Sequence, residues 1–201
     1  MFSVARISGP SAIAVAGDVP GPHLPDDPGV TQVIAAVQNT VDGPTGWLGR
    51  CIGKQRLRME AGHFPCRDLD LPYPPLIGNV TVTYLTPEMT EETIDEANYR
   101  TIGSKLRFIS GFAFPATACE PDAIRIEYDA GYEPANVPPE AKRAVVLMAM
   151  KMVSFSKETL FLRSEEVDGI GKIDYTVFDQ AGEVLRKASD ELLSGLKIYQ
   201  L

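Results

Sequence analysis

The sequence has few of the residues from which catalytic and metal sites are usually built. Its 201 residues include only two histidines, three cysteines and one tryptophan. Neither histidine stands near a cysteine or a carboxylate at metal-ligand spacing, so a zinc site or a serine–histidine–aspartate triad is unsupported. The cysteines, Cys51, Cys66 and Cys119, show no CxxC spacing. This pattern argues against a disulfide framework and favours reduced thiols in a cytoplasmic product.

Positive charge and long apolar runs are also scarce. Lysine and arginine number 19 against 27 aspartates and glutamates, which gives a formal net charge of -8. A protein that holds nucleic acid through its phosphates needs clustered cations, so this composition argues against such a role. The apolar run from Ala144 to Met150 is bracketed by Arg143 and Lys151. It is far shorter than the roughly 20 residues that span a bilayer, so we expect no membrane contact.

What the sequence does contain is three stretches with helical spacing of apolar residues. Asp27 is placed to cap the first and Asp179 the last, and two prolines open the middle one. These signals predict helices over about residues 28–42, 138–158 and 180–194. The middle helix is the expected core, with a buried face made by Ala141, Ala144, Val145, Met148, Met152 and Phe155.

Between residues 54 and 132 the apolar period changes from helical to two. Short alternating runs separated by turn residues indicate a small, mostly antiparallel β unit, with Tyr128 in its core. Strands grouped between helices favour an α+β fold, a small helical core with an inserted mostly antiparallel β subdomain. The expected division is an extended N-terminal arm over 1–25, a helical core with a C-terminal strand and tail over 26–50 and 136–201, and the β insertion over 51–135. Within the arm we expect one short strand, over residues 12–16.

Two C-terminal segments are candidate interaction sites. Ile173, Tyr175 and Val177 alternate with polar residues, like a lone strand in the helical half of the chain. A lone strand needs an edge to pair with, so we expect strand addition to a neighbouring subunit or another protein. The chain also ends on apolar residues, which indicates a covered surface. The partner-binding residues expected there are Leu196, Ile198, Tyr199 and Leu201; alternatively Leu196 and Ile198 fold back onto the chain's own helices.

Candidates for catalysis are weak. His23 lies in a proline-rich segment and His63 in an expected turn, each without a partner at useful spacing. Asp68 and Asp70 share one strand face and could form a carboxylate pair, but solvated residues opposite Leu69 are the favoured interpretation. We therefore expect no enzyme, no cofactor and no metal.

Several short motifs follow one another in a distinctive order. They are GPTGWLGR over 43–50 with Gln55, LPYPPL over 71–76, the strand over 80–84, Tyr99-Arg100, Phe114-Pro115, Ala130-Gly131-Tyr132 and Val137-Pro138. This ordered set resembles the head–tail connector proteins of tailed phages, also called adaptor or head-completion proteins. Similar proteins occur in gene transfer agents. The resemblance covers roughly residues 27–155.

The resemblance implies a role in the neck of a virion. In that family a helical core carries a β insertion, and about a dozen copies form a ring beneath the portal protein. DNA passes through the ring without sequence-specific binding, and the tail docks below through a tail-completion or tail-terminator protein. The C-terminal segment commonly reaches the portal, which would make it the portal interface. Assembly would take place in the cytoplasm of a bacterial host.

The resemblance also suggests roles for individual residues. Trp47 and Leu48 would form the hinge between the first helix and the β unit, although a buried aromatic without such a role is equally consistent. Gly131 would let the chain turn from the last strand toward the middle helix. One departure is that the prolines of residues 20–28 prohibit the additional helix that the family usually has before the first.

Two alternative functions stay open at this point. One is a small-ligand or glycan-binding, enzyme-like domain whose site lies in the β unit. The other is a different virion part, such as a tail-completion protein.

Substitution of His63, Asp68 or Asp70 by alanine is expected to leave folding and particle assembly near normal, because these residues are assigned to the surface. Particle yield and infectivity, measured beside a melting curve, check this expectation. Loss of infectivity with intact folding in any one variant would reopen the enzyme interpretation.

Overall fold

The computed structural model describes residues 2–64, 67–154, 164–167, 171–174 and 177–199. Over these residues the fold is α+β, as the sequence predicts, with three α-helices and antiparallel sheets of five and three strands. The chain forms two compact units. The β unit comprises residues 1–11, 42–137 and 198–201, and the helical unit comprises 12–41 and 138–197. Among the described helices, none has the length and apolar character needed to cross a membrane.

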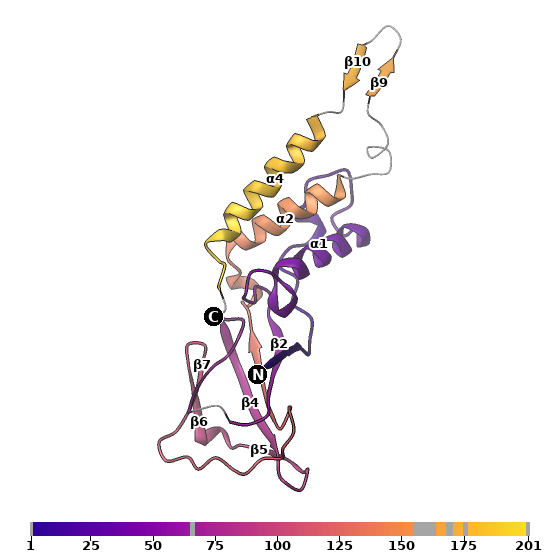
Figure 1. Cartoon of the computed structure of the whole chain (residues 1–201). Coiled ribbons are helices and arrows are strands. Elements are labelled where there is room, and N and C mark those ends of the chain that lie inside the picture. Colours follow the sequence, from indigo (N-terminus) through magenta and orange to yellow (C-terminus); the bar gives the residue numbers. More distant parts are fainter. Residues whose placement is uncertain (1, 65–66, 155–163, 168–170, 175–176, 200–201) are drawn as a thin grey trace. The chain divides into compact units, whose positions relative to one another are not determined.

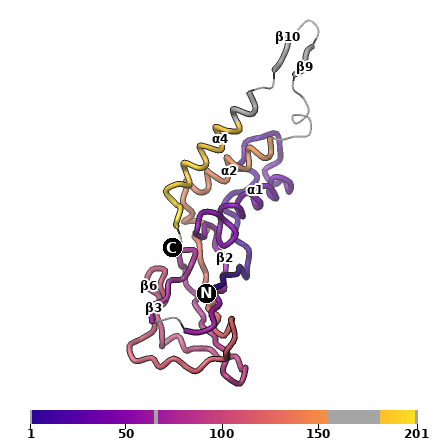
Figure 2. The backbone as a smooth tube through the Cα atoms, in the orientation of Figure 1, coloured from indigo at the N-terminus to yellow at the C-terminus, as the bar shows by residue number. Residues whose placement is uncertain are grey.

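In the helical unit, α2 (Pro139–Val153) packs between α1 (Pro28–Val41) and α4 (Val177–Ser194) (Figures 1 and 2). Asp27 caps α1 as predicted, because its Oδ1 accepts hydrogen bonds from Gly29 N at 2.8 Å and Val30 N at 3.2 Å. The predicted apolar faces of α1 and α2 supply the core of the unit. Buried residues on these two helices include Val30, Ile34, Val37, Val41, Ala141, Ala144 and Val145.

Two details of the predicted helices were wrong. Asp179 lies inside α4, which begins at Val177, so it is not the residue before the helix. Val177 continues the apolar alternation of the residues before it and also fits the helical spacing of the apolar residues after it. The apolar period alone therefore could not show where α4 begins. Met152 is 53% exposed, because the buried face of α2 instead takes in Val146, Leu147 and Ala149. The part of the middle helix predicted beyond Ser154 lies outside the described residues.

The β unit contains both larger sheets. The five-stranded sheet has the order β1 (Ser3–Arg6), β2 (Gln55–Ala61), β8 (Ile124–Ala130), β4 (Leu76–Leu85) and β5 (Glu91–Thr93). The three-stranded sheet has the order β3 (Asp68–Asp70), β7 (Lys105–Phe108) and β6 (Tyr99–Ile102). Their apolar faces form one core, which includes Leu57, Met59, Ile126 and Tyr128 from the larger sheet and Leu106 and Phe108 from the smaller. Tyr128 is buried, as predicted, and its hydroxyl donates to Pro72 O at 2.8 Å.

The N-terminal strand is not where the sequence pattern suggested. The strand is β1, which pairs with β2 so that Val4 lies opposite Met59. The segment expected to be a strand, residues 12–16, instead packs in the helical unit, where Ile13 N donates to Gln38 Oε1 at 3.3 Å. Both segments are short, and what distinguishes them is that residues 3–6 pair with the edge of β2. No local sequence pattern reveals that edge.

The expectation of an unpaired strand near the C-terminus was also wrong. β10 (Gly171–Asp174) pairs with β9 (Ser164–Val167) in an antiparallel ladder that places Ile173 opposite Glu165. β9 has the sequence SEEV, which carries no apolar alternation and so escaped notice. Val177 lies in α4 rather than in a strand, and Tyr175 lies outside the described residues.

A buried carboxylate organises the segment that follows α1. The side chain of Asp42 accepts hydrogen bonds from Ile52 N at 2.7 Å, Gly53 N at 2.9 Å and Gln55 Nε2 at 2.8 Å. Its main-chain oxygen accepts from Arg6 Nη2 at 2.7 Å. Asp42 is 0% exposed. These bonds close residues 43–51 into a loop and fix where β2 begins, beside β1.

Gly131 follows the last residue of β8 and has a positive φ of 109°. The chain turns here, as expected of a glycine at this position. A side chain here would overlap the main chain of Gly53. The adjacent Tyr132 N donates to Ile52 O at 2.9 Å, and Gly131 N donates to Pro75 O at 2.9 Å. The end of β8 is therefore held against the start of β2.

Replacing Asp42 with asparagine is expected to lower the free energy of unfolding by about 2–4 kcal/mol, because one of several buried donors loses its acceptor. Urea denaturation measures the change. Asp70→Asn is the matched control. Asp70 is exposed and pairs with Lys105 at 3.1 Å, so its loss should change stability by less than about 0.5 kcal/mol. Equal effects of the two substitutions would refute the role assigned to Asp42.

Candidate functional site

The residues weighed for catalysis do not come together. His23 lies in the helical unit, whereas His63 is exposed in the β unit. Asp68 and Asp70 are exposed and each meets a cation of β7, with Arg107 Nη2 at 2.8 Å from Asp68 Oδ2. That hydrogen bond holds the pKa of Asp68 below its usual value. Within the described residues, no group of three or more His, Cys, Asp or Glu side chains could hold a metal ion.

The face of the large sheet opposite the core is a ladder of paired charges. Arg58 Nη2 lies 2.7 Å from Glu127 Oε1, and Arg56 Nε lies 3.1 Å from Glu127 Oε2. Arg56 also reaches Asp129, with Nη1 and Oδ1 3.0 Å apart. The hydrogen bond from Arg58 is the main cause of a lowered pKa at Glu127; Arg56 adds to it and partial burial opposes it. The charges on β2 and β8 therefore neutralise one another across the ladder.

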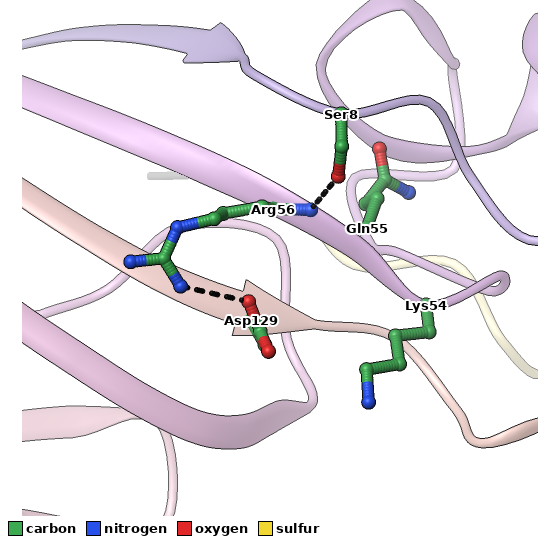
Figure 3. A pocket seen from close by; sticks show the side chains of 5 residues that line it. All are labelled: Ser8, Lys54, Gln55, Arg56 and Asp129. Atoms are coloured by element: carbon green, nitrogen blue, oxygen red, sulfur yellow. Dashed lines mark hydrogen bonds and ion pairs between the residues drawn. The ribbon is translucent and has the colours of Figure 1, made fainter.

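At one end of this ladder is a polar hollow of about 540 Å³ (Figure 3). Its lining residues are Ser8, Lys54, Gln55, Arg56 and Asp129. Arg56 extends toward Asp129, its main-chain N donates to Ser8 Oγ at 3.0 Å, and Gln55 points away from Lys54. Lys54 Nζ lies 2.7 Å from Glu133 Oε1. Both cations of the hollow thus have carboxylate partners, which disfavours a phosphate or carboxylate ligand here.

An aromatic cluster lies in the β unit around Phe108. The ring of Phe108 stacks on Phe112 with centroids 5.2 Å apart and meets Phe114 edge-on at 5.1 Å. Phe64 packs against both Phe108 and Phe114. Phe114 is 39% exposed. Sequence reasoning missed this cluster, although phenylalanines at 108, 112 and 114 crowd one short stretch and were the signal available.

The C-terminal segment is held by the loop that Asp42 closes. Ile198 N donates to Leu48 O at 2.9 Å, and Ile198 is half-buried. Gly49, with a φ of 74°, approaches the main chain of Ile198 so closely that a side chain would overlap it. Tyr199 is 76% exposed and Leu196 half-buried, whereas Leu201 lies outside the described residues. At Ile198 the segment therefore contacts a loop of the β unit. The alternative expected from sequence was that Leu196 and Ile198 fold back onto the chain's own helices.

The two residues predicted to form a hinge differ in exposure. Leu48 is fully buried and Trp47 is 44% exposed. The hinge itself stays a prediction.

No protein-family model matches the chain, and no curated protein matches it. Solved structures share its fold. A chain in the neck of an empty gene transfer agent particle, computed with C6 symmetry, superposes with a TM-score of 0.63 at 11% identity, covering 99% of this chain and 97% of the other. A chain in the neck of a native particle, computed with C12 symmetry, gives 0.59 at 12% identity over 87% and 85%. A chain of the native gene transfer agent virion gives 0.58 at 12% identity over 98% and 96%.

The paired charges on the sheet predict a stability that depends on pH. Because the pKa of folded Glu127 is lowered, its contribution is complete above the unfolded-state value near 4.5 and is lost as pH falls through the folded value. Glu127→Gln should therefore lower the melting temperature at pH 7 and have little effect near pH 3. Thermal melts at the two pH values measure this difference.

Glu88→Gln, in an exposed turn, serves as the control and should match the parent at both pH values. A deficit of Glu127→Gln that is equally large at pH 3 would contradict the ion-pair explanation.

Proposed function

We propose that this chain is a structural head–tail connector of a tailed phage or phage-like particle. Copies would form a ring below the portal protein, DNA would pass through the ring, and the tail would dock beneath it. The observation that carries the proposal is the near-complete overlap with a chain from a particle neck, 99% of this chain and 97% of the other. The superposition includes both compact units, and the ordered sequence motifs point to the same class of protein.

The electrostatics of the chain support a structural role. The net charge is -8, and the sheet cations Arg56 and Arg58 are already paired with carboxylates. Binding to DNA phosphates draws its free energy from counterion release by unpaired cations. A ring of such subunits would let DNA slide through without gripping it. A scaffold of this kind needs no catalytic group, and we propose that the chain is not an enzyme.

The number of copies is part of the proposal. Two of the similar neck structures were computed with C12 and C6 symmetry, which fits a ring of about twelve subunits. A ring repeats each weak contact many times, so a modest affinity per subunit becomes firm attachment.

The C-terminal segment is the proposed portal interface. Ile198 is fixed by its bond to Leu48, which leaves Tyr199 as the exposed apolar side chain of the described tail. An anchored segment that ends in an exposed aromatic residue suits docking, because the anchor reduces the entropy lost on binding. Leu196 and Leu201 complete the interface in this proposal.

We also propose that the hairpin of β9 and β10 binds a neighbouring subunit or another protein. The sequence suggested a lone strand in this role, and the hairpin now replaces it. Ile173 has a strand partner within the hairpin, so strand addition would use the other edge of β10. Tyr175 was assigned to the same contact from sequence and remains with the proposal, whereas Val177 lies in α4 and is no longer part of it.

Deletion of residues 199–201 is expected to abolish binding to portal rings while leaving the melting temperature near that of the parent, because the Ile198–Leu48 bond is retained. Electron micrographs of portal mixed with each protein show whether a ring is added. Met89→Ala is the control, since Met89 is 58% exposed in a loop of the β unit.

A truncated protein that still decorates portals would rule out the tail as the anchor. A parent that never decorates them would refute the connector function itself.

A further inference from the structure

The outer face of the three-stranded sheet carries two arginines side by side. Arg100 on β6 lies directly opposite Arg107 on β7, and like charges at opposed positions destabilise a sheet. Arg107 is compensated, because its Nε and Nη2 both donate to the carboxylate of Asp68 on β3. Arg100 is exposed and has no carboxylate in ion-pair contact among the described residues. Glu96 borders the same hollow of about 270 Å³ without pairing to it.

The residue before Arg100 fixes its direction. Tyr99 is buried, its hydroxyl donates to Val80 O at 2.9 Å, and its ring meets that of Phe108 with centroids 6.1 Å apart. Because successive strand residues point to opposite faces, the burial of Tyr99 turns Arg100 and Ile102 to the outer face. Ile102 is 45% exposed. The face therefore offers an uncompensated cation and an apolar side chain two residues apart on one strand.

The turn between β4 and β5 offers the complementary groups. Met89 is 58% exposed, and its φ of 63° is in a region that glycine adopts more readily. The carboxylate of Glu88, beside it, is exposed and has no partner in the described part of the chain. Met89 N donates to Thr86 O and Thr86 N to Thr90 O, both at 2.8 Å, so the turn is well fixed. Backbone strain of this kind persists mainly where a side chain is used.

Sequence neighbours distinguish this turn from the other exposed apolar positions. Among the exposed large apolar side chains of the described ranges, Met89 and Val184 alone have a carboxylate as the adjacent residue. The neighbour of Val184 is Glu183, whose Oε1 is held by Arg186 Nη2 at 2.6 Å. The neighbour of Met89 is Glu88, which is unpaired. The turn thus presents an apolar group and an available negative charge together.

The cations near other exposed apolar residues are already compensated. Lys151 precedes Met152, and Lys187 lies one turn from Val184. The pKa of Glu183 is lowered, chiefly by its hydrogen bond from Arg186, and both lysines add to that shift, so each lies near a carboxylate. Arg100 instead faces another cation. Charge complementarity therefore matches the β4–β5 turn to the outer face of the small sheet.

We infer that the β4–β5 turn of one copy docks on the outer face of the three-stranded sheet of a second copy. Glu88 lies between Arg100 and Arg107, where a carboxylate offsets the repulsion that the fold leaves in place. Met89 packs against Ile102. The contact joins two different surfaces, so it is heterologous and repeats from copy to copy until a ring closes. The inference rests on the proposed function, because a ring needs such a repeating contact.

Charge reversal tests the ionic half of the contact. Arg100→Glu and Glu88→Arg should each weaken self-association at least about fivefold, and combining them should recover part of the loss. Lys187→Glu, the same reversal at another exposed lysine, should match the parent. Sedimentation equilibrium at low salt measures association, because salt screens exposed pairs. Arg100→Glu should melt no lower than the parent, since its new carboxylate faces Arg107.

A cross-link tests the apolar half. In a background with Cys66→Ser and Cys119→Ser, the pair Met89→Cys and Ile102→Cys should form disulfide-linked dimers and higher multimers at high concentration. The pair Met89→Cys and Val184→Cys is the control and should not. Loss of the Met89 side chain alone should still allow binding to portal, because the carboxylate of the turn and the C-terminal segment remain.

The inference is overturned if the two cysteine pairs cross-link equally or not at all, or if the first pair closes only within one chain. It is also overturned if Arg100→Glu loses binding to portal but keeps self-association, because the partner of this face would then be another protein. The proposed function is judged separately, by whether the parent decorates portal rings. A protein that cross-links through positions 89 and 102, but whose parent never binds portal, would refute the connector role and leave this contact standing.

Discussion

The β unit depends on one buried carboxylate. Asp42 is fully shielded from solvent and gathers donors from the start of β2, while its main-chain oxygen receives Arg6 from β1. An irregular loop of this length would otherwise leave buried main-chain N–H groups without acceptors, at a cost of about 1–3 kcal/mol each. Gly53, one of those donors, is also the residue on which the end of β8 rests. The register of the sheet and the path of the loop are therefore fixed at one point.

The two faces of the large sheet differ in composition and in contacts. One face contributes Leu57, Met59 and Tyr128 to a core that the smaller sheet completes. The other contributes alternating charges that pair across β2 and β8. Such pairing gives a surface that is soluble and also geometrically fixed, since each arginine is oriented by carboxylates on the adjacent strand. In the proposed connector role, a rigid sheet would matter more than a reactive one.

Much of this fold can be predicted from the sequence because the local signals agree with one another. Asp27, the spacing of Val30, Ile34 and Val37, and the stop at Gly43 all specify the same helix, and the alternation in β2 and β8 specifies strands with Tyr128 inside. The failures have a common cause. β1 and β9 are strands because another strand lies beside them, and nothing in their own residues distinguishes them from other short segments.

The interaction sites were less predictable still. The apolar end of the chain was recognisable, but its anchor at Leu48 joins residues 150 positions apart. Nothing in the sequence around Asp42 marks it as buried, and only the folded loop makes it a buried acceptor. The docking role proposed for Tyr199 depends on the surface of another protein, which this sequence does not encode.

The close approach of Gly49 to Ile198 has a consequence for how this protein can vary. Any side chain at position 49 would occupy the space of the terminal segment, so the terminus could remain in place only if the loop moved. A substitution at Gly49 is therefore expected to displace either the loop or the terminal segment. A substitution at position 49, in the first quarter of the chain, could therefore change the conformation of the C-terminal segment without any change in that segment's own codons.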